Sequence, residues 1–202
     1  KEIVYDEKGI IPYVNYLKEH AQPPVDYILD LFTKYDIVII AERMHPETTQ
    51  WDFIYELTSD PRFIDNVGII FTEYGSVVQQ PELERFMNTP LSPEDRDKAV
   101  IHLLQNFPIW PAGWTNNNIY NYLRKLHTLN QQIEPQKRIS LYFSDISWKW
   151  EGKLKEEYDK RQTTDALRRD EIMADRISKK LREIQASDSS RKKALVVMNS
   201  RH

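Results

Sequence analysis

Four short apolar runs constrain the fold of this chain more than any other feature of its sequence. They are IVIIA at 37–41, VGIIF at 67–71, ISLYF at 139–143 and ALVV at 194–197. None of them alternates regularly between apolar and polar residues, and such continuous runs are typical of strands covered on both faces. We therefore expect each run to form a buried strand.

Segments with helical periodicity separate these runs. They lie at 47–57, 118–130 and 165–185, and one or two further helices are expected within 11–31. The alternation of strands and helices favours parallel strands joined by right-handed crossovers. The chain is therefore predicted to form a single α/β domain over residues 1–202, with a central, mainly parallel sheet and flanking helices.

Composition narrows the class of protein. With 40% hydrophobic and 29% charged residues in 202, the chain has the balance of a globular domain. The net charge of −3, with acids and bases interspersed, does not favour a nucleic-acid partner, which usually meets a basic face. No apolar run reaches the roughly 20 residues that a membrane helix needs. The chain has no Cys, which excludes disulfides and Cys-based zinc sites.

Polar residues follow the apolar runs. Glu42 and His45 come after the first run, Glu73 after the second, Asp145 after the third, and the fourth leads to His202. The carboxyl ends of parallel strands meet at one edge of a sheet, where ligands bind. We expect these five side chains to share a crevice. For any one of them taken alone, an ordinary loop residue is the alternative.

The long helix predicted at 165–185 adds an acid to this region. Its apolar stripe runs back to Met173, and a further step of three residues reaches Asp170. We therefore expect Asp170 to be buried near the crevice, with Arg169 beside it, because a buried carboxylate requires a partner. The alternative is that Asp170 caps the helix or pairs locally with Arg168 or Arg169.

An insertion lies between the second run and the helix at 118–130. It covers residues 81–116, contains a helix near 93–104, and closes with FPIWPAGW, which includes Trp110 and Trp114. A helical insertion here is predicted to form a lid over the C-terminal rim of the sheet, with the two tryptophans contacting the substrate. The alternative is that they pack the insertion onto the sheet.

In this order, the motifs resemble those of the erythromycin esterase family. They are IVIIAERMH followed by GIIFTE, WPAGWTNNNIYNYLRKLHTLNQQ followed by RISLYFSDISW, RRDEIMADRI with Arg169 and Asp170, and ALVVMNSRH. The likeness covers about residues 36–202. It implies a fold of the erythromycin esterase and ChaN-like type. The wider superfamily also includes Tiki-type proteases and ChaN-like haem-binding proteins.

The resemblance implies roles for particular residues. The family's catalytic acid and histidine correspond to Glu42 and His45, its second-strand glutamate to Glu73, and its final histidine to His202. Asn199 stands where the family has the first histidine of its closing motif. The site implied for this chain therefore has two histidines instead of three.

The residues themselves suggest how His45 could act as a base. Pro46 suits the first position of the following helix, which would place His45 near that helix's N-terminus. The positive end of the helix dipole disfavours an imidazolium and keeps the ring able to take a proton. A carboxylate from Glu42 or Glu73 would fix its tautomer.

These observations predict an esterase-like hydrolase that acts on an ester, lactone or amide bond of a small-molecule substrate. Water activated by His45 would attack, and His202 or Arg169 would stabilise the oxyanion, without a cofactor. One alternative is a binding module for haem or another small molecule. The other is hydrolysis with a divalent metal, for which the candidate ligands are Glu42, His45, Glu73, Asp145 and His202.

Both ends of the chain suggest expectations. Because it begins with Lys1 instead of Met, an extracytoplasmic location is compatible with the sequence. The chain ends at His202, directly on a candidate catalytic residue. We therefore expect the natural protein to continue beyond this position.

Overall fold

The computed structural model describes residues 7–107, 117–157, 159–160 and 168–202. Its four strands form one sheet in the order β1-β4-β2-β3, and every pairing is parallel. The strands are β1 (Ile37–Glu42), β2 (Ile69–Ser76), β3 (Ser140–Asp145) and β4 (Ala194–Asn199). The predicted α/β class and parallel sheet are therefore confirmed.

Helices occupy the connections, as the periodicity predicted. They are α1 (Glu7–His20), α2 (Pro24–Leu31), α3 (Thr48–Ser59), α4 (Pro61–Asn66), α5 (Gln80–Asn88), α6 (Pro93–Gln105), α8 (Asn117–Gln132) and α10 (Arg169–Ser187). Two of these, α4 and α5, had no separate prediction. Pro lies in the first turn of both, where its missing N–H removes no helical hydrogen bond.

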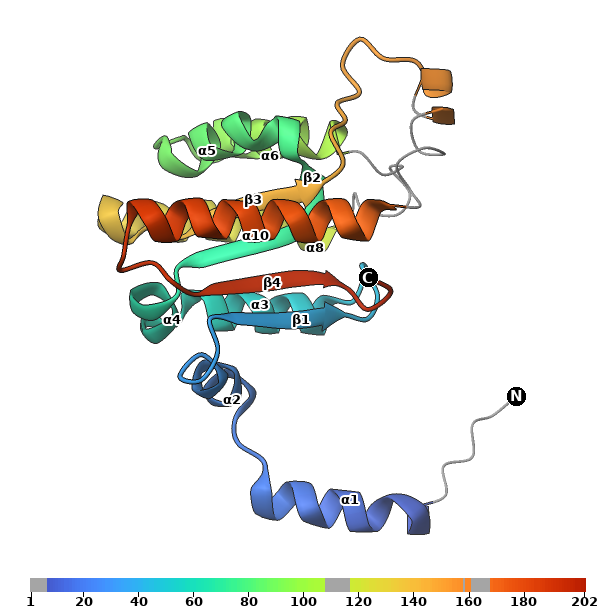
Figure 1. Ribbon diagram of the computed structural model, residues 1–202, viewed down its shortest axis with the longest axis vertical. Helices are drawn as coiled ribbons and strands as arrows, with labels where there is room; N and C mark the ends of the chain where they lie inside the picture. Colours follow the sequence, from blue (N-terminus) through green and yellow to red (C-terminus); the bar gives the residue numbers. More distant parts are fainter. Residues whose placement is uncertain (1–6, 108–116, 158, 161–167) are drawn as a thin grey trace.

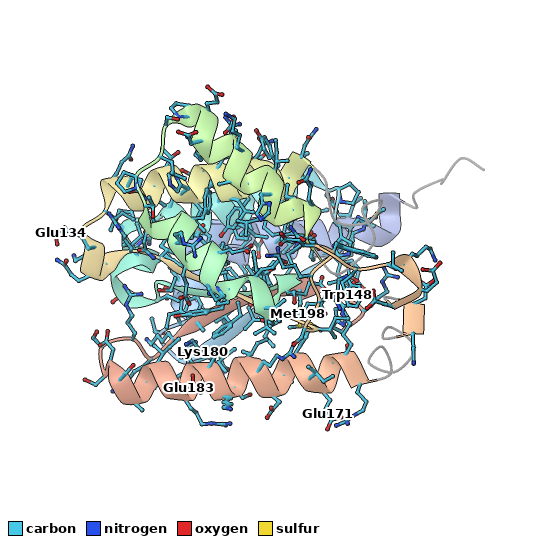
Figure 2. All side chains as sticks on the ribbon, turned by 90° about the horizontal axis from the view of Figure 1, so that it is seen from above. Glu134, Trp148, Glu171, Lys180, Glu183 and Met198 are labelled. Atoms are coloured by element: carbon cyan, nitrogen blue, oxygen red, sulfur yellow. The ribbon has the colours of Figure 1, made fainter. Side chains whose placement is uncertain are left out.

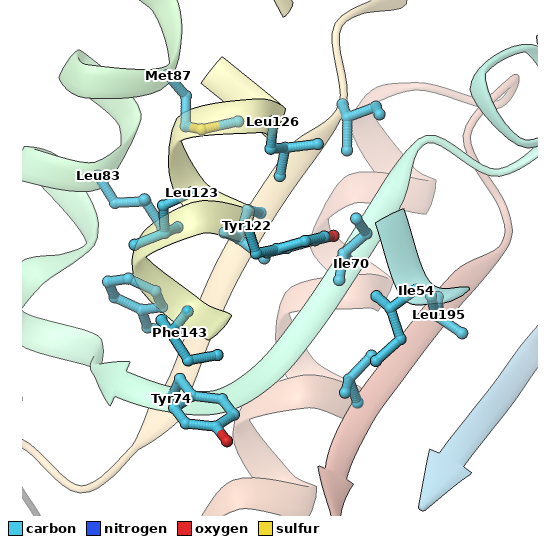
Figure 3. Packing of buried hydrophobic residues seen from close by; sticks show 14 of the residues in the cluster. Ile54, Ile70, Tyr74, Leu83, Met87, Tyr122, Leu123, Leu126, Phe143 and Leu195 are labelled. Atoms are coloured by element: carbon cyan, nitrogen blue, oxygen red, sulfur yellow. The ribbon is translucent and has the colours of Figure 1, made fainter. Parts of the chain in front are cut away.

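Helical layers cover the two faces of the sheet (Figures 1 and 2). On one face, the main core packs α3, α5, α6 and α8 against the strands, with Leu123, Leu126 and Leu195 at its centre (Figure 3). On the other face, Ile177 and Leu181 of α10 pack against β2 and β4. Each fully buried Leu contributes about 1.5–3 kcal/mol to the stability of this core.

Burial differs sharply between the central and edge strands. All eight residues of β2 are buried, as expected for a strand covered on both faces. In β1 the prediction of full burial is wrong, because Ile37 and Ile39 are 42% and 61% exposed while Val38 is buried. The reason is positional, since β1 is an edge strand and the α10 cluster reaches only β2, β3 and β4.

Two amide side chains block the outer edge of β3. Gln80 donates to the Leu141 carbonyl at 3.1 Å and accepts from the Phe143 amide at 3.0 Å. Asn130 makes the same pair of bonds to Ile139, at 2.9 and 3.0 Å. These side chains take the place of a further strand and protect the edge from pairing with another chain.

The described part of the predicted lid belongs to the helical layer. Helix α6 confirms the helix predicted near 93–104, and both α5 and α6 pack against α8. Trp110 and Trp114 lie in residues 108–116, outside the described residues, so their contact with a substrate stays a prediction. Among the described residues, no helix is both long enough and apolar enough to cross a membrane.

Candidate active site at the carboxyl ends of the strands

The strand-end residues singled out in the sequence lie close together in the structure. His45 contacts Glu42, and His202 contacts Glu73. The ligand atoms of Glu42, His45 and Glu73 all lie within 4.8 Å of one another. Asp145 joins them through Arg169, which also reaches Glu73. These five side chains therefore lie together at one rim, as expected for the carboxyl ends of parallel strands.

Glu42 is the most firmly held group of the site. It is fully buried at the end of β1, and its carboxyl accepts from Trp51 Nε1 at 2.5 Å and from the Tyr74 hydroxyl at 2.8 and 2.9 Å. Burial, reinforced by Glu42, raises the pKa of Tyr74, so the phenol keeps its proton and acts as a donor. His45 Nδ1 lies 2.5 Å from the same carboxyl.

Sequence reasoning missed these two anchoring side chains. A buried Trp or Tyr usually finds a hydrogen-bond partner for its N–H or O–H. This tendency is the sequence signal that could have pointed to Trp51 and Tyr74. Only the tertiary structure identifies Glu42 as the partner that they share.

The segment that carries His45 differs from the prediction. The Glu47 amide donates to the Met44 carbonyl at 3.0 Å, which closes a turn around His45 and Pro46. Glu47 is extended at the N-cap, and α3 begins at Thr48. The expectation that Pro46 opens the helix is therefore wrong. The imidazole is oriented by two contacts of its Nδ1, to the Glu42 carboxyl at 2.5 Å and to the Tyr74 hydroxyl at 2.8 Å.

Two amides hold this segment against the domain. Gln50 donates to the Ala41 carbonyl at 2.9 Å and accepts from the Arg43 amide at 3.1 Å. Asn118, in the first turn of α8, donates to the carbonyl of His45 at 3.1 Å. The segment that carries the candidate base is thus tied to α3 through Gln50 and to α8 through Asn118.

The pairing of β2 is irregular beside Glu73 and Tyr74, two successive residues that both reach the site. Successive side chains of a strand point to opposite faces, and Tyr74 accordingly packs in the main core with Ile70, whereas Phe71 lies in the α10 cluster. The pairing of β2 with β3 shifts between Thr72 and Ser76. Gly75 has a φ of 77° there, and a Cβ would lie 2.5 Å from the Phe143 ring. Gly75 therefore allows β2 to approach the Phe143 ring directly after Glu73 and Tyr74.

Arg169 compensates two buried acids. Its Nε donates to Asp145 Oδ1 at 2.7 Å and its Nη2 to Glu73 Oε2 at 3.4 Å, while both carboxyl side chains are fully buried. Burial raises the pKa of Glu73, opposed by His202 and Arg169. Burial likewise raises the pKa of Asp145, again opposed by Arg169. In both cases the loss of hydration outweighs the attraction to the cations.

His202 bridges the buried acids to the surface. Its Nε2 lies 2.6 Å from Glu73 Oε2 and 3.1 Å from Arg169 Nη1, and its Nδ1 lies 2.6 Å from Asp170 Oδ1. The imidazole is 13% exposed, whereas the Asp170 side chain is 64% exposed. The side chains from Glu73 through His202 to Asp170 therefore form a continuous polar path from the interior to solvent.

The prediction that Asp170 is buried is wrong, and helix geometry gives the reason. Met173, Ile177 and Leu181 are buried at successive steps of four residues. The same step continues to Arg169, which faces inward, whereas a step of three leads to Asp170 on the outer side of this row. The side chain within hydrogen-bonding distance of Asp170 is that of His202, which sequence reasoning did not specify.

Asn199 stands where the resemblance to the esterase motif implies a histidine. Its backbone amide donates to Glu73 Oε1 at 2.6 Å. Its side-chain oxygen accepts from the backbone amide of Arg201 at 3.2 Å and from the Arg201 guanidinium at 3.1 Å. The residue therefore positions Glu73 through its backbone.

Comparison with protein-family models, curated proteins and solved structures gave no match to this chain.

Proposed function

We propose that the protein is a hydrolase in which His45 activates water for attack on an ester, lactone or amide. The observation that carries this proposal is the 2.5 Å contact between His45 Nδ1 and a fully buried Glu42 carboxyl. Trp51 and Tyr74 donate to the same carboxyl, which makes Glu42 the acceptor. His45 Nδ1 then carries the hydrogen, and the neutral ring has its lone pair on Nε2.

The proposed reaction needs no covalent enzyme intermediate. Nε2 of His45 takes a proton from water while the water oxygen bonds to the carbonyl carbon of the substrate. The imidazolium then returns the proton to the leaving oxygen or nitrogen as the carbon–heteroatom bond breaks. A carboxylic acid and an alcohol or amine are released. The buried Glu42 carboxyl stabilises the transient imidazolium.

Arg169 and His202 stabilise the negative charge of the tetrahedral intermediate. Arg169 and His202 lie 3.1 Å apart, with Glu73 between the two halves of the site. A guanidinium held by two buried carboxyls is pre-oriented, so little reorganisation is needed when charge develops on the substrate oxygen. The resemblance of the motifs to those of erythromycin esterases supports the same class of reaction.

A metal-assisted hydrolase is a second candidate, favoured by one observation. Glu42, His45 and Glu73 offer two carboxylate oxygens and one imidazole nitrogen within 4.8 Å, a donor set that suits zinc and related divalent metals. These residues would hold the ion, which would lower the pKa of a bound water. The direct Glu42–His45 contact favours the metal-free mechanism.

The test is an assay of the intact protein on a panel of esters, lactones and amides. His45→Ala should lower the hydrolytic rate by about 10²- to 10⁴-fold. His102→Ala is the matched control, because His102 is an exposed histidine 3.8 Å from a carboxylate, Glu82, on the outer helices. Circular dichroism should show both variants folded.

Three outcomes distinguish the metal-free hydrolase, the metal-assisted hydrolase and the ligand-binding module. An active wild type with an equally active His45→Ala variant would remove His45 from the mechanism. Activity that is lost on dialysis against a chelator and restored by a divalent metal would establish the second candidate. Inactivity of the wild type on the whole panel, with or without added metal, would reject the hydrolase in favour of a ligand-binding module.

A further inference from the structure

The outer edge of β1 is open along its first half. Amides at the two ends of β4 donate to the carbonyls of Asp36 and Glu42, at 2.8 and 2.9 Å. Even-numbered residues of β1 therefore direct their backbone groups toward β4, and odd-numbered ones direct them outward. Gln50 occupies the outward groups near the strand's end. Within the described ranges, no residue bonds the outward amide and carbonyl groups of Ile37 and Ile39.

The side chains at this edge are also uncovered. Ile39 is 61% exposed and Ile37 is 42% exposed, on the face of the sheet that carries α10. Natural edge strands are usually protected by charges, Pro, bulges or covering elements. The β3 edge has such protection in the side chains of Gln80 and Asn130. The strand IVIIA has neither charge nor Pro at 37–41.

We infer that β1 pairs antiparallel with β1 of a second copy of this chain, so that two sheets become one. The strand is self-complementary. The outward amide and carbonyl of Ile37 in one copy can bond to the outward carbonyl and amide of Ile39 in the other, and Ile39 of the first copy can bond to Ile37 of the second in the same way. This register forms about four backbone hydrogen bonds around a two-fold axis and leaves Gln50 in place. A two-fold pair also closes, since the blocked β3 edges at the two ends cannot recruit further copies.

Helix α1 adds a second observation on the same side of the molecule. It stands apart from the domain beyond the β1 edge (Figure 1), and Ile10, Val14 and Leu17 are exposed at helical spacing. Its two Lys and two Glu balance, whereas helices that bind membrane surfaces are usually rich in Lys and Arg. An apolar protein surface is the better match, and the second copy provides one at its own exposed β1 face.

The mass in solution tests the pairing. Light scattering coupled to size exclusion should give twice the monomer mass for the wild type. Ile39→Lys places two like charges near the axis and should return the monomer mass at the same protein concentration. Ile101→Lys is the matched control, since Ile101 is 46% exposed on α6, a helix that packs against α5 and α8. This variant should remain dimeric.

Cross-linking tests the register independently of any loss of stability. The chain has no Cys, so Ile39→Cys introduces one thiol. In the inferred register the two residues at position 39 are diagonal neighbours about 7–8 Å apart, within reach of a short bis-maleimide. Ile101→Cys should give no cross-linked dimer.

Three results would overturn the inference. The first is a wild type with the monomer mass up to about 1 mM. The second is a dimer that survives Ile39→Lys and fails to cross-link at Ile39→Cys. The third is a monomer that sediments with phosphatidylcholine vesicles, which would assign the apolar surface to a membrane.

Discussion

Replacing Arg169 by Met should destabilise the fold strongly and in a pH-dependent way. The guanidinium is 15% exposed and pairs with two carboxyls, Glu73 and Asp145, that are fully buried. Removing one member of a buried ion pair costs about 3–5 kcal/mol, because the remaining charge is left without a partner. For a chain of this size, that loss lowers the Tm by about 6–20 °C.

The way in which the stability loss changes with pH follows from the pKa shifts of the two acids. Burial raises the pKa of Glu73 and of Asp145 above their ordinary values of 4.5 and 3.8. The folded state therefore binds their protons more tightly than the unfolded chain, and their contribution to stability falls as pH rises through this range. Arg169 opposes that effect. Its removal should therefore cost most at neutral pH and less at acidic pH, where protonation of the two carboxyls removes the charges that Arg169 compensates.

Urea denaturation at about pH 4 and at about pH 8 measures both predictions. Arg168→Met is the matched control, since Arg168 is the adjacent residue and is 67% exposed in a pair with exposed Glu171. This control should change stability by less than about 1 kcal/mol. If Arg169→Met costs no more than the control, or costs the same at both pH values, the compensation of two buried acids is refuted.

Two further predictions concern the groups around this pair. Asp170→Asn keeps the shape of a side chain that is 64% exposed and bonded to His202. Urea denaturation should therefore show a loss of stability below about 1 kcal/mol, while kcat falls. A large loss of stability would contradict the exposed position. Trp51→Phe removes a hydrogen-bond donor from the buried Glu42 carboxyl, so the free energy of unfolding should fall by about 1–3 kcal/mol in the same assay. An unchanged urea midpoint would show that the 2.5 Å bond contributes little to stability.

The sequence by itself determined the layer structure and the place of the candidate site. Continuous apolar runs separated by helical periodicity require parallel strands with helical crossovers, and parallel strands deliver their last residues to one rim. For that reason Glu42, His45, Glu73, Asp145 and His202 were recognisable as a group. Their proposed chemistry also followed from residue type, since only His titrates near neutral pH without a large shift.

Only the tertiary structure decided which residues are neighbours. Periodicity reports the face on which a side chain lies, but it carries no information on strand order, so the exposed face of β1 was invisible in a run that looks fully buried. Trp51 and Tyr74 come to Glu42 from segments 9 and 32 residues away. Arg169 faces the buried acids in place of Asp170 because the inward row of α10 continues in steps of four, a choice set by how that helix packs on the sheet.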